Sequence, residues 1–279
     1  MAGIALAEPQ VCTDIATLAA DALRQEVWLT PKPGLVDSAN NGSHSDMDLP
    51  MFLRSIGAIT PWLHQFYRLG QQDAVQPATS VLKRIRPAGL ACEQAMFGAT
   101  NGINTHKGGI FSLGILCTAA GRISARQQLL TRTALCAEVA ALTQGLVERE
   151  LQHCRQPVTA GERLFQAHGM TGARGEVQSG FVTLRRHVLP YWQTETQPER
   201  RGLNALLRLM AFNPDTNLVS RGGLSGLHFV QDYARKLLKS GWQKEDLQEM
   251  DQALISRHLS PGGSADLLAI ATVLMAFPQ

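Results

Sequence analysis

The chain has 279 residues, of which 44% are hydrophobic and 18% are charged. This composition is typical of a folded globular protein and excludes a highly charged, extended disordered chain. The formal net charge of +3 is too small for the dense basic surface of a nucleic-acid-binding protein. We therefore expect no nucleic-acid partner and, at most, a local site for an anionic ligand.

The N-terminus and the cysteines predict a cytoplasmic protein. No basic segment precedes the short apolar stretch of the first ten residues, and Glu8 and Pro9 interrupt it, so we expect no cleavable signal. No apolar run reaches the ~18 residues needed to cross a bilayer, so we expect no membrane contact. The cysteines are odd in number and typical of reduced packing residues. They are Cys12, Cys92, Cys117, Cys136 and Cys154.

Apolar residues recur at helical spacing along most of the chain. In the first segment they are Val11, Ile15, Leu18, Ala22 and Val27. Short strand-like alternations bounded by tight turns do not occur, and residues 181–189 read as a helix that ends before Pro190. We predict an all-α, single-domain bundle of about ten helices over residues 1–279.

Between the predicted helices lie polar, glycine-rich connections that carry more functional groups than ordinary bundle loops need. We expect them to converge on one nucleotide site. They are PKPGLVDSANNGSHSDMD at 31–48, NGINTHKGG at 101–109, TGARGE at 171–176, NPDTNLVSRGG at 213–223 and SPGGSAD at 260–266.

The first connection holds a lysine between two prolines, which fix the backbone on either side of it. Lys32 is thereby held in a restricted direction, as a candidate phosphate ligand. Asp37 and Asp46 follow, and their carboxylates are hard oxygen ligands of the kind that bind Mg²⁺ together with substrate phosphates. The alternative is a solvated loop in which Asp46 or Asp48 caps the next helix.

The second connection runs directly into an apolar segment that reads as a helix. A helix N-terminus stabilises an anion through its dipole and its unpaired N–H groups. It is not a Walker A loop, because a glycine stands after Lys107 where serine or threonine is required. The alternative is a glycine-rich cap with Lys107 facing solvent. The candidate phosphate ligands here are Asn104, Thr105, Lys107 and Gly108.

The last three connections place arginines and hydroxyls beside glycines. Such an arginine can hold a phosphate through two hydrogen bonds while the glycines let it approach the backbone. Equally, the arginine can pair with a carboxylate and tie two helices together. Asp266 is a cap, a ligand or a base. The candidate phosphate ligands are Arg174, Arg221, Gly222, Gly223, Ser260, Gly262, Gly263 and Ser264.

Glu93 lies among small and apolar residues that are expected to face the core. A buried carboxylate must be paired, bound to a ligand or protonated, because burying an isolated charge costs several kcal/mol. Glu93 is therefore either a site residue or the partner of an arginine.

Taken in order, the five connections resemble those of the triphosphoribosyl-dephospho-CoA synthases. The likeness runs from about Glu26 to the C-terminus, and residues 1–25 match less well. Residues 91–122 look closer to the citrate lyase branch than to the malonate decarboxylase branch. The resemblance implies a transferase that attaches the 5-triphosphoribosyl group of ATP to the 2′-hydroxyl of 3′-dephospho-CoA and releases adenine.

The resemblance also implies partners for the product. It would be the precursor of the prosthetic group of the citrate lyase acyl carrier subunit, passed on through a carrier-protein transferase. A homodimer is left open by the sequence.

The implied chemistry assigns roles to the candidate residues. Mg²⁺ would accompany the triphosphate, carboxylates would stabilise an oxocarbenium-like state at C1 of the ribose, and a general base would accept the proton of the 2′-hydroxyl. Glu93 or Glu176 is the predicted base, and His106 is an alternative base or the group that assists the departing adenine. The metal candidates are Asp37, Asp46, Asp215 and Asp266.

Two rival functions remain open from the sequence. One is an ADP-ribosyl hydrolase-like, Mg²⁺-dependent enzyme, to which DTN at 215–217 bears a faint likeness. It would transfer a ribosyl group to water. The other is a non-catalytic nucleotide-binding subunit that presents the cofactor precursor to a lyase complex.

Overall fold

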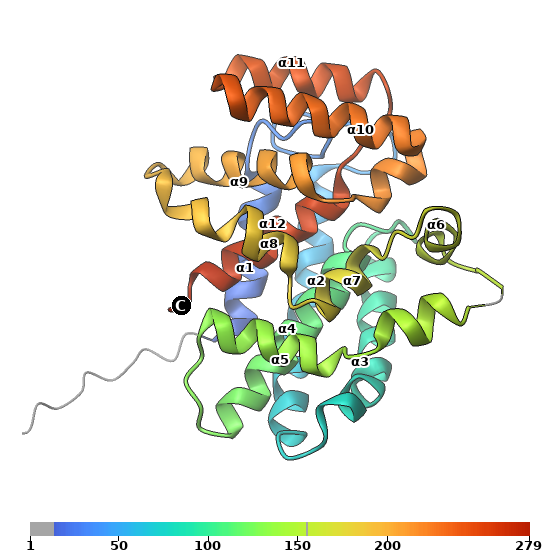
Figure 1. Ribbon diagram of the computed structural model, residues 1–279, viewed down its shortest axis with the longest axis vertical. Helices are drawn as coiled ribbons and strands as arrows, with labels where there is room; N and C mark the ends of the chain where they lie inside the picture. The colour runs from blue at the N-terminus through green and yellow to red at the C-terminus, as the bar shows by residue number, and fades with distance from the viewer. Residues whose placement is uncertain (1–13, 155) are drawn as a thin grey trace, which may run out of the picture.

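The computed structural model describes residues 14–154 and 156–279. These residues form twelve α-helices, a π-helical turn η1 (Glu148–Gln152) and a 3₁₀ turn η2 (Leu189–Thr194), without any strand among them (Figure 1). The predicted all-α class is confirmed. The expectation that no signal precedes the fold and the assignment of Cys12 lie outside the described residues.

The helices outnumber the predicted ten because several are short. The first six are α1 Ile15–Trp28, α2 Leu49–Gln72, α3 Ala78–Ala99, α4 Lys107–Ala125, α5 Arg132–Leu142 and α6 Ala160–His168. The others are α7 Gly172–Gln178, α8 Val182–His187, α9 Pro198–Phe212, α10 Thr216–Ser240, α11 Lys244–Ile255 and α12 Gly262–Met275.

Helix α4 forms the centre of the core. Its side chains are apolar and buried almost all round, and it packs most extensively against α2. Two glycines let the backbones of these helices touch. A Cβ on Gly70 would overlap the carbonyl oxygen of Thr118, and a Cβ on Gly121 would overlap that of Tyr67. This contact fixes the position of α4, whose N-terminal turn carries Lys107.

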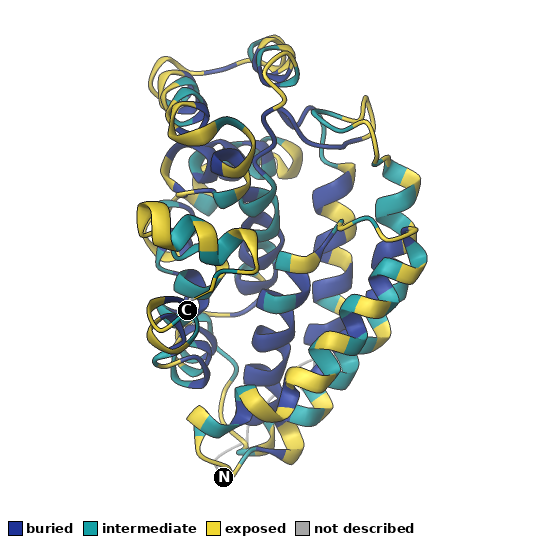
Figure 2. Cartoon of the chain, turned by 90° about the vertical axis from the view of Figure 1, so that its right-hand side faces the viewer, coloured by how far each residue is buried: buried dark blue, intermediate teal, exposed yellow. Residues whose placement is uncertain are grey.

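By length and composition α4 would also pass as a membrane span, the single such helix within the described residues. However, 78% of its apolar window is buried inside the fold. Figure 2 shows the buried residues concentrated in the central helices, with exposed residues on the outer faces. The hydrophobicity of α4 is therefore that of a core helix.

The polar segment 29–48 links α1 to α2 and runs across to the end of the molecule formed by α10 and α11 (Figure 1). The N–H of Gly34 donates to Oδ1 of Asp251 at 2.8 Å, and the hydroxyl of Ser43 donates to the carbonyl oxygen of Leu259 at 2.6 Å. These bonds hold the segment beside the start of α12.

Most of the predicted polar connections are the first turns of helices, which corrects their expected assignment as loops. Residues 172–176 lie in α7, and α10 begins at Thr216 and continues to a kink at Gly223, where φ is 64°. Likewise α12 begins at Gly262. Small and polar residues are favoured in first helical turns as well as in loops, so composition alone does not separate the two.

Candidate active site

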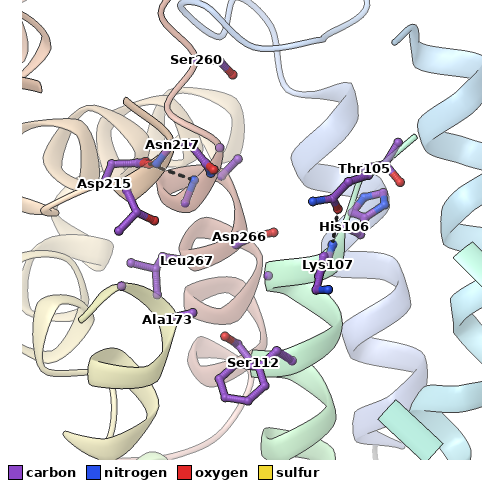
Figure 3. Close-up of a pocket in the computed structure, with 18 of the residues that line it drawn as sticks. Thr105, His106, Lys107, Ser112, Ala173, Asp215, Asn217, Ser260, Asp266 and Leu267 are labelled. Carbon is purple, nitrogen blue, oxygen red and sulfur yellow. Dashed lines mark hydrogen bonds between the residues drawn. The ribbon is translucent and has the colours of Figure 1, made fainter. Parts of the chain in front are cut away.

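A cavity of about 780 Å³ opens where the N-terminal turns of α4, α6, α7, α10 and α12 meet (Figure 3). Segment 29–48 and the C-terminal end of α1 complete its wall. Each of the five predicted connections contributes to this lining. Helix N-termini carry partial positive charge and N–H groups without intrahelical partners, so this arrangement favours an anionic ligand.

Most of the predicted site residues line the cavity. They are Lys32, Glu93, Asn104, Thr105, His106, Lys107, Gly108, Arg174, Glu176, Asp215, Arg221, Ser260, Gly262, Gly263 and Asp266. The other predicted residues do not line it. They are Asp37, Asp46, Gly222, Gly223 and Ser264.

Two of the predicted metal ligands lie outside the cavity for different reasons. Asp37 is buried within its own turn, where its carboxylate accepts from the N–H groups of Lys32 at 2.8 Å and Ala39 at 2.7 Å. Asp46 is exposed. The next carboxylate, Asp48, caps α2 by accepting from the N–H of Met51 at 2.8 Å. The helix-capping alternative is thus realised at Asp48, whereas Asp37 has a structural role that was not anticipated.

The two glycines and the serine that do not line the cavity have structural roles. A Cβ on Gly222 would press against the side chain of Leu259, and Gly223 forms the kink in α10. The hydroxyl of Ser264 is buried and donates to Oδ2 of Asp215 at 2.9 Å.

We call the buried ionisable residues that line the cavity its floor; they are Glu26, Lys32, His106, Glu176 and Asp215, each at most 9% exposed. Lys32 forms an ion pair with Glu26, with Nζ 2.5 Å from Oε1. Its ammonium is thus already neutralised within the protein. Glu26 was missed as a site residue. A signal for it was present, because it lies on the apolar face of α1 beside Val27, where a carboxylate needs a partner.

Asp266 lies next to the floor, against the first turn of α4. A Cβ on Gly108 would overlap its carboxylate, so the glycine leaves room for it. Burial raises the pKa of Asp266 well above its usual value, and the negative charges of Glu26 and Asp215 raise it further. The N–H of Gly109 opposes this shift of the pKa. No described side chain donates a hydrogen bond to Asp266.

Asp215 is, by contrast, fully engaged in structural hydrogen bonds. It is the N-cap of α10, where Oδ1 accepts from the N–H of Asn217 at 2.9 Å. Its Oδ2 accepts from the N–H of Ser264 at 2.8 Å and so ties α10 to α12. Burial raises its pKa, while these hydrogen bonds act in the opposite direction. Figure 3 shows Asp215 and Lys107 on opposite sides of the cavity with Asp266 between them.

The two predicted bases differ in their surroundings. Glu93 pairs with Lys107, whose Nζ lies 2.9 Å from Oε2 and whose side chain is half exposed. The alternative to a site role for Glu93 was a pair with an arginine, and its observed partner is a lysine. Glu176 is buried, and its Oε1 accepts from the hydroxyl of Thr183 at 2.5 Å. Burial raises the pKa of Glu176, and the Thr183 hydrogen bonds oppose that rise.

We call the three cationic side chains at the opening the mouth of the cavity; they are Lys107, Arg174 and Arg221. The guanidinium of Arg174 lies 2.9 Å from Glu150, so its helix-tying alternative is realised. Arg221 donates to the carbonyl oxygens of Ser43 at 3.1 Å and His258 at 3.3 Å. Both arginines still line the cavity while making these contacts.

His106 is held as a neutral imidazole. Thr105 donates its hydroxyl proton to Ser55 Oγ at 2.7 Å, and Ser55 Oγ also lies 2.7 Å from Nδ1 of His106, to which the Ser55 hydroxyl can donate. The remaining proton of a neutral ring is then on Nε2, which has no hydrogen-bond partner among the described residues. Burial, aided by the charge of Lys32, lowers the pKa of His106 to about 3. Such a ring is a hydrogen-bond donor and a poor base.

Comparison with known proteins decides the family. A family model described as ATP:dephospho-CoA triphosphoribosyl transferase matches residues 12–279. The chain belongs to this family. The family membership confirms the resemblance that the five connections indicated.

Similar proteins of this transferase family come from several bacteria. The 2-(5''-triphosphoribosyl)-3'-dephosphocoenzyme-A synthase of Pectobacterium atrosepticum is 54% identical over 269 residues, which cover 95% of this chain and 89% of that protein. Proteins given the same name with the prefix "Probable" are 51% identical in Albidiferax ferrireducens and 47% identical in Vibrio cholerae. Their alignments cover 93% and 94% of this chain and 89% and 87% of those proteins. No solved structure matches the chain.

The residues of this transferase fit Mg²⁺ only together with a bound nucleotide. Among the described residues, no group of three or more His, Cys, Asp or Glu side chains is arranged to hold a metal ion. Mg²⁺ in nucleotide sites is typically bound by one or two carboxylates plus substrate phosphates. Asp266 offers such a carboxylate, and a cation there would offset its repulsion by Glu26 and Asp215.

The neutral state of His106 predicts how stability depends on pH. The unfolded chain takes up a proton near pH 6.5, whereas folded His106 does so only near pH 3. Stability should therefore fall as pH drops from 6.5 towards 3, by at most about 1.4 kcal/mol per pH unit from this residue. Urea unfolding of the His106→Asn variant should show a shallower pH dependence than the wild type. A slope equal to that of a control with exposed His168 replaced by Asn would contradict the assignment.

Proposed function

We propose that the chain attaches the 5-triphosphoribosyl group of ATP to the 2′-hydroxyl of 3′-dephospho-CoA and releases adenine. The observation that carries this proposal is the separation of charge within one cavity. Cationic side chains lie at the mouth with helix N-termini around them, while the carboxylates of Glu26, Glu176 and Asp215 are buried at the floor. One substrate with anionic phosphates at one end and a reacting sugar at the other matches that separation.

The mouth suits the phosphate groups. Lys107 and Arg221 are exposed enough to meet an incoming polyanion, and the first turns of α4 and α12 add favourable dipoles. The floor does not suit phosphate, because Lys32 is already neutralised by Glu26. We therefore assign phosphate contacts to the mouth and not to Lys32, which was predicted as a phosphate ligand.

The floor suits the reacting ribose. In the proposed reaction the bond from C1 to the adenine nitrogen breaks, and a bond from C1 to the 2′-oxygen of dephospho-CoA forms. Positive charge develops at C1 in between, and the carboxylate of Asp266, which has no cationic partner among the described residues, stabilises it. The 2′-hydroxyl proton passes to a carboxylate. Glu176 fits this role better than Glu93, because its pKa is raised while Glu93 pairs with Lys107 at the mouth.

His106 and Mg²⁺ complete the proposal. The N–H of His106 Nε2 is suited to donate a hydrogen bond to a nitrogen of the departing adenine and keeps its own proton. The proton that adenine gains comes from solvent and is balanced by the 2′-hydroxyl proton that Glu176 takes up. Asp266, with Asp215 nearby, would hold Mg²⁺ against the triphosphate, and the ion would supply charge neutralisation there. The citrate lyase branch, the carrier-protein partners, a homodimer and a cytoplasmic location stay predictions.

Mass spectrometry of the products separates this proposal from its rivals. The protein is incubated with ATP and Mg²⁺, with and without 3′-dephospho-CoA. We expect adenine and the triphosphoribosyl adduct only when dephospho-CoA is present. Adenine release without it, or equal turnover of an ADP-ribosylated substrate, would favour the hydrolase. Nucleotide binding without any adenine would favour the non-catalytic subunit.

Substitution of Lys107 by Ala tests the assignment of the mouth. The side chain is half exposed and its partner is a single carboxylate, so its loss should change stability by less than about 1 kcal/mol. We expect the KM for ATP to rise about tenfold or more, since a charge-assisted contact with phosphate is lost. Exposed Lys236 replaced by Ala is the control. An unchanged KM would remove Lys107 from the site.

A further inference from the structure

We infer that His44 is a positioning residue that fixes the hydroxyl of Ser260 as a hydrogen-bond donor to a substrate phosphate oxygen. His44 lies in segment 29–48 and lines the cavity together with Ser260 and Arg221. The identity of the ligand in this inference rests on the proposed function. The hydrogen-bond geometry from which we argue is independent of that function.

The direction of each hydrogen bond follows from what each group can do. A guanidinium only donates, and Nη2 of Arg221 lies 3.0 Å from Nδ1 of His44, so Nδ1 must be the unprotonated nitrogen. The ring proton is therefore on Nε2, which lies 2.8 Å from Oγ of Ser260. His44 donates and Ser260 accepts, which leaves the hydroxyl proton of Ser260 unused.

That proton faces a site prepared for an anion. Ser260 is 3% exposed, and no other described residue forms a hydrogen bond with its hydroxyl. It lies just before the first turn of α12 (Figure 3). Gly262 and Gly263 of that turn also line the cavity. A buried donor without an acceptor is costly, and a helix N-terminus favours an anionic acceptor. A phosphate oxygen of either substrate would accept the hydroxyl proton of Ser260 and would also place negative charge at the N-terminus of α12.

Arg221 then acts through His44. Its Nη1 is held by the carbonyl oxygens of Ser43 and His258, so the guanidinium cannot turn away from Nδ1 without breaking those bonds. We call this chain of hydrogen bonds the relay; it runs from Arg221 through His44 to Ser260. The relay joins α10, segment 29–48 and the start of α12 at one point of the cavity wall. A purely structural clip would join the same segments but would not require a particular ring tautomer.

Two variants at position 44 test the relay. Gln keeps an amide donor at the reach of the ring Nε2, whereas Leu keeps neither a donor nor an acceptor. We expect His44→Leu and Ser260→Ala to raise KM about tenfold for ATP or for dephospho-CoA, with the change falling on KM more than on kcat. His44→Gln should recover part of the loss. Equal KM values for the Leu and Gln variants would overturn the inference.

The double variant His44→Leu, Ser260→Ala separates the relay from a structural role. If His44 acts through Ser260, the double variant should bind no more weakly than Ser260→Ala alone. If the loss of affinity in the double variant equals the product of the losses in the two single variants, the inference is overturned.

Calorimetric titration with ATP and with dephospho-CoA gives the same comparison without turnover. If the wild type makes no adduct but His44→Leu still binds one nucleotide more weakly than His44→Gln does, the proposed function fails while the relay stands. If the wild type makes the adduct and all four variants bind like it, the relay alone fails.

Discussion

Replacing Asp266 by Asn is expected to lower adenine release by about 100-fold or more while leaving the fold at least as stable as the wild type. The carboxylate has no side-chain donor among the described residues, and its pKa is raised well above 3.8 by burial and by Glu26 and Asp215. The charged form therefore weakens the fold at neutral pH, and the neutral amide removes that repulsion. Product analysis and thermal unfolding of the same preparation measure both effects.

The pH dependence gives a further check on Asp266. Because its folded pKa is raised, the wild type should gain stability as pH falls from neutrality towards 3.8. The Asp266→Asn variant should lack that gain. Loss of stability together with activity in this variant would contradict a functional role and indicate a structural one.

Asp215→Asn is the matched control, with the opposite expectation for stability. Oδ1 faces the N–H of Asn217 and Oδ2 faces the N–H of Ser264, so either orientation of an amide opposes its NH₂ to a backbone donor. We expect a loss of about 2 kcal/mol. A fold as stable as the wild type would mean that these hydrogen bonds do not hold α10 to α12.

Replacing Gly70 by Ala is expected to destabilise the fold by about 3 kcal/mol, because the new Cβ would overlap the backbone of Thr118. The helices α2 and α4 would have to move apart along their most extensive contact. Since α4 carries Lys107 and Gly108 into the cavity, nucleotide affinity should fall as well. Chemical unfolding measures the first effect and calorimetric titration with ATP the second.

Gly57→Ala, on the same helix, is the control for Gly70. No atom lies within 4 Å of a Cβ built there, and the position is exposed. Alanine should therefore stabilise the fold by ~0.5 to 1 kcal/mol through its helix propensity. If both variants lose stability equally, the close approach of α2 and α4 is not what Gly70 permits.

Helical periodicity was enough to predict the all-α class, because the amphipathic repeat is local in sequence. Periodicity could not locate the helix ends within polar segments. In 213–223, for example, Asp215 caps α10 and the following residues are helical, yet their composition is that of a loop. Whether a polar, glycine-rich run continues as a helix depends on its cap and on what packs against it, and the latter is set by the rest of the fold.

The motifs contained most of the predicted residues that line the cavity, but they did not indicate the partner of each residue. The motifs indicated Lys32 as a phosphate ligand, whereas its ammonium is buried against Glu26. Glu93 was predicted to be either a site residue or the partner of an arginine, and it pairs with Lys107. Asp37 closes its own turn. Charged groups pair with whichever opposite charge lies nearest in space. These partners therefore depend on how α1, α3, α4 and segment 29–48 pack.

The sequence by itself determined the family, the helical class and the chemical groups available to the site, because each depends on residue types in a fixed order along the chain. Only the tertiary structure decided which of those groups face the cavity and which are already paired. It also decided that the mouth is cationic while the carboxylates lie deeper, since burial and proximity arise when helices distant in sequence meet. The protonated nitrogens of His44 and His106 likewise follow from neighbours that the fold brings to them.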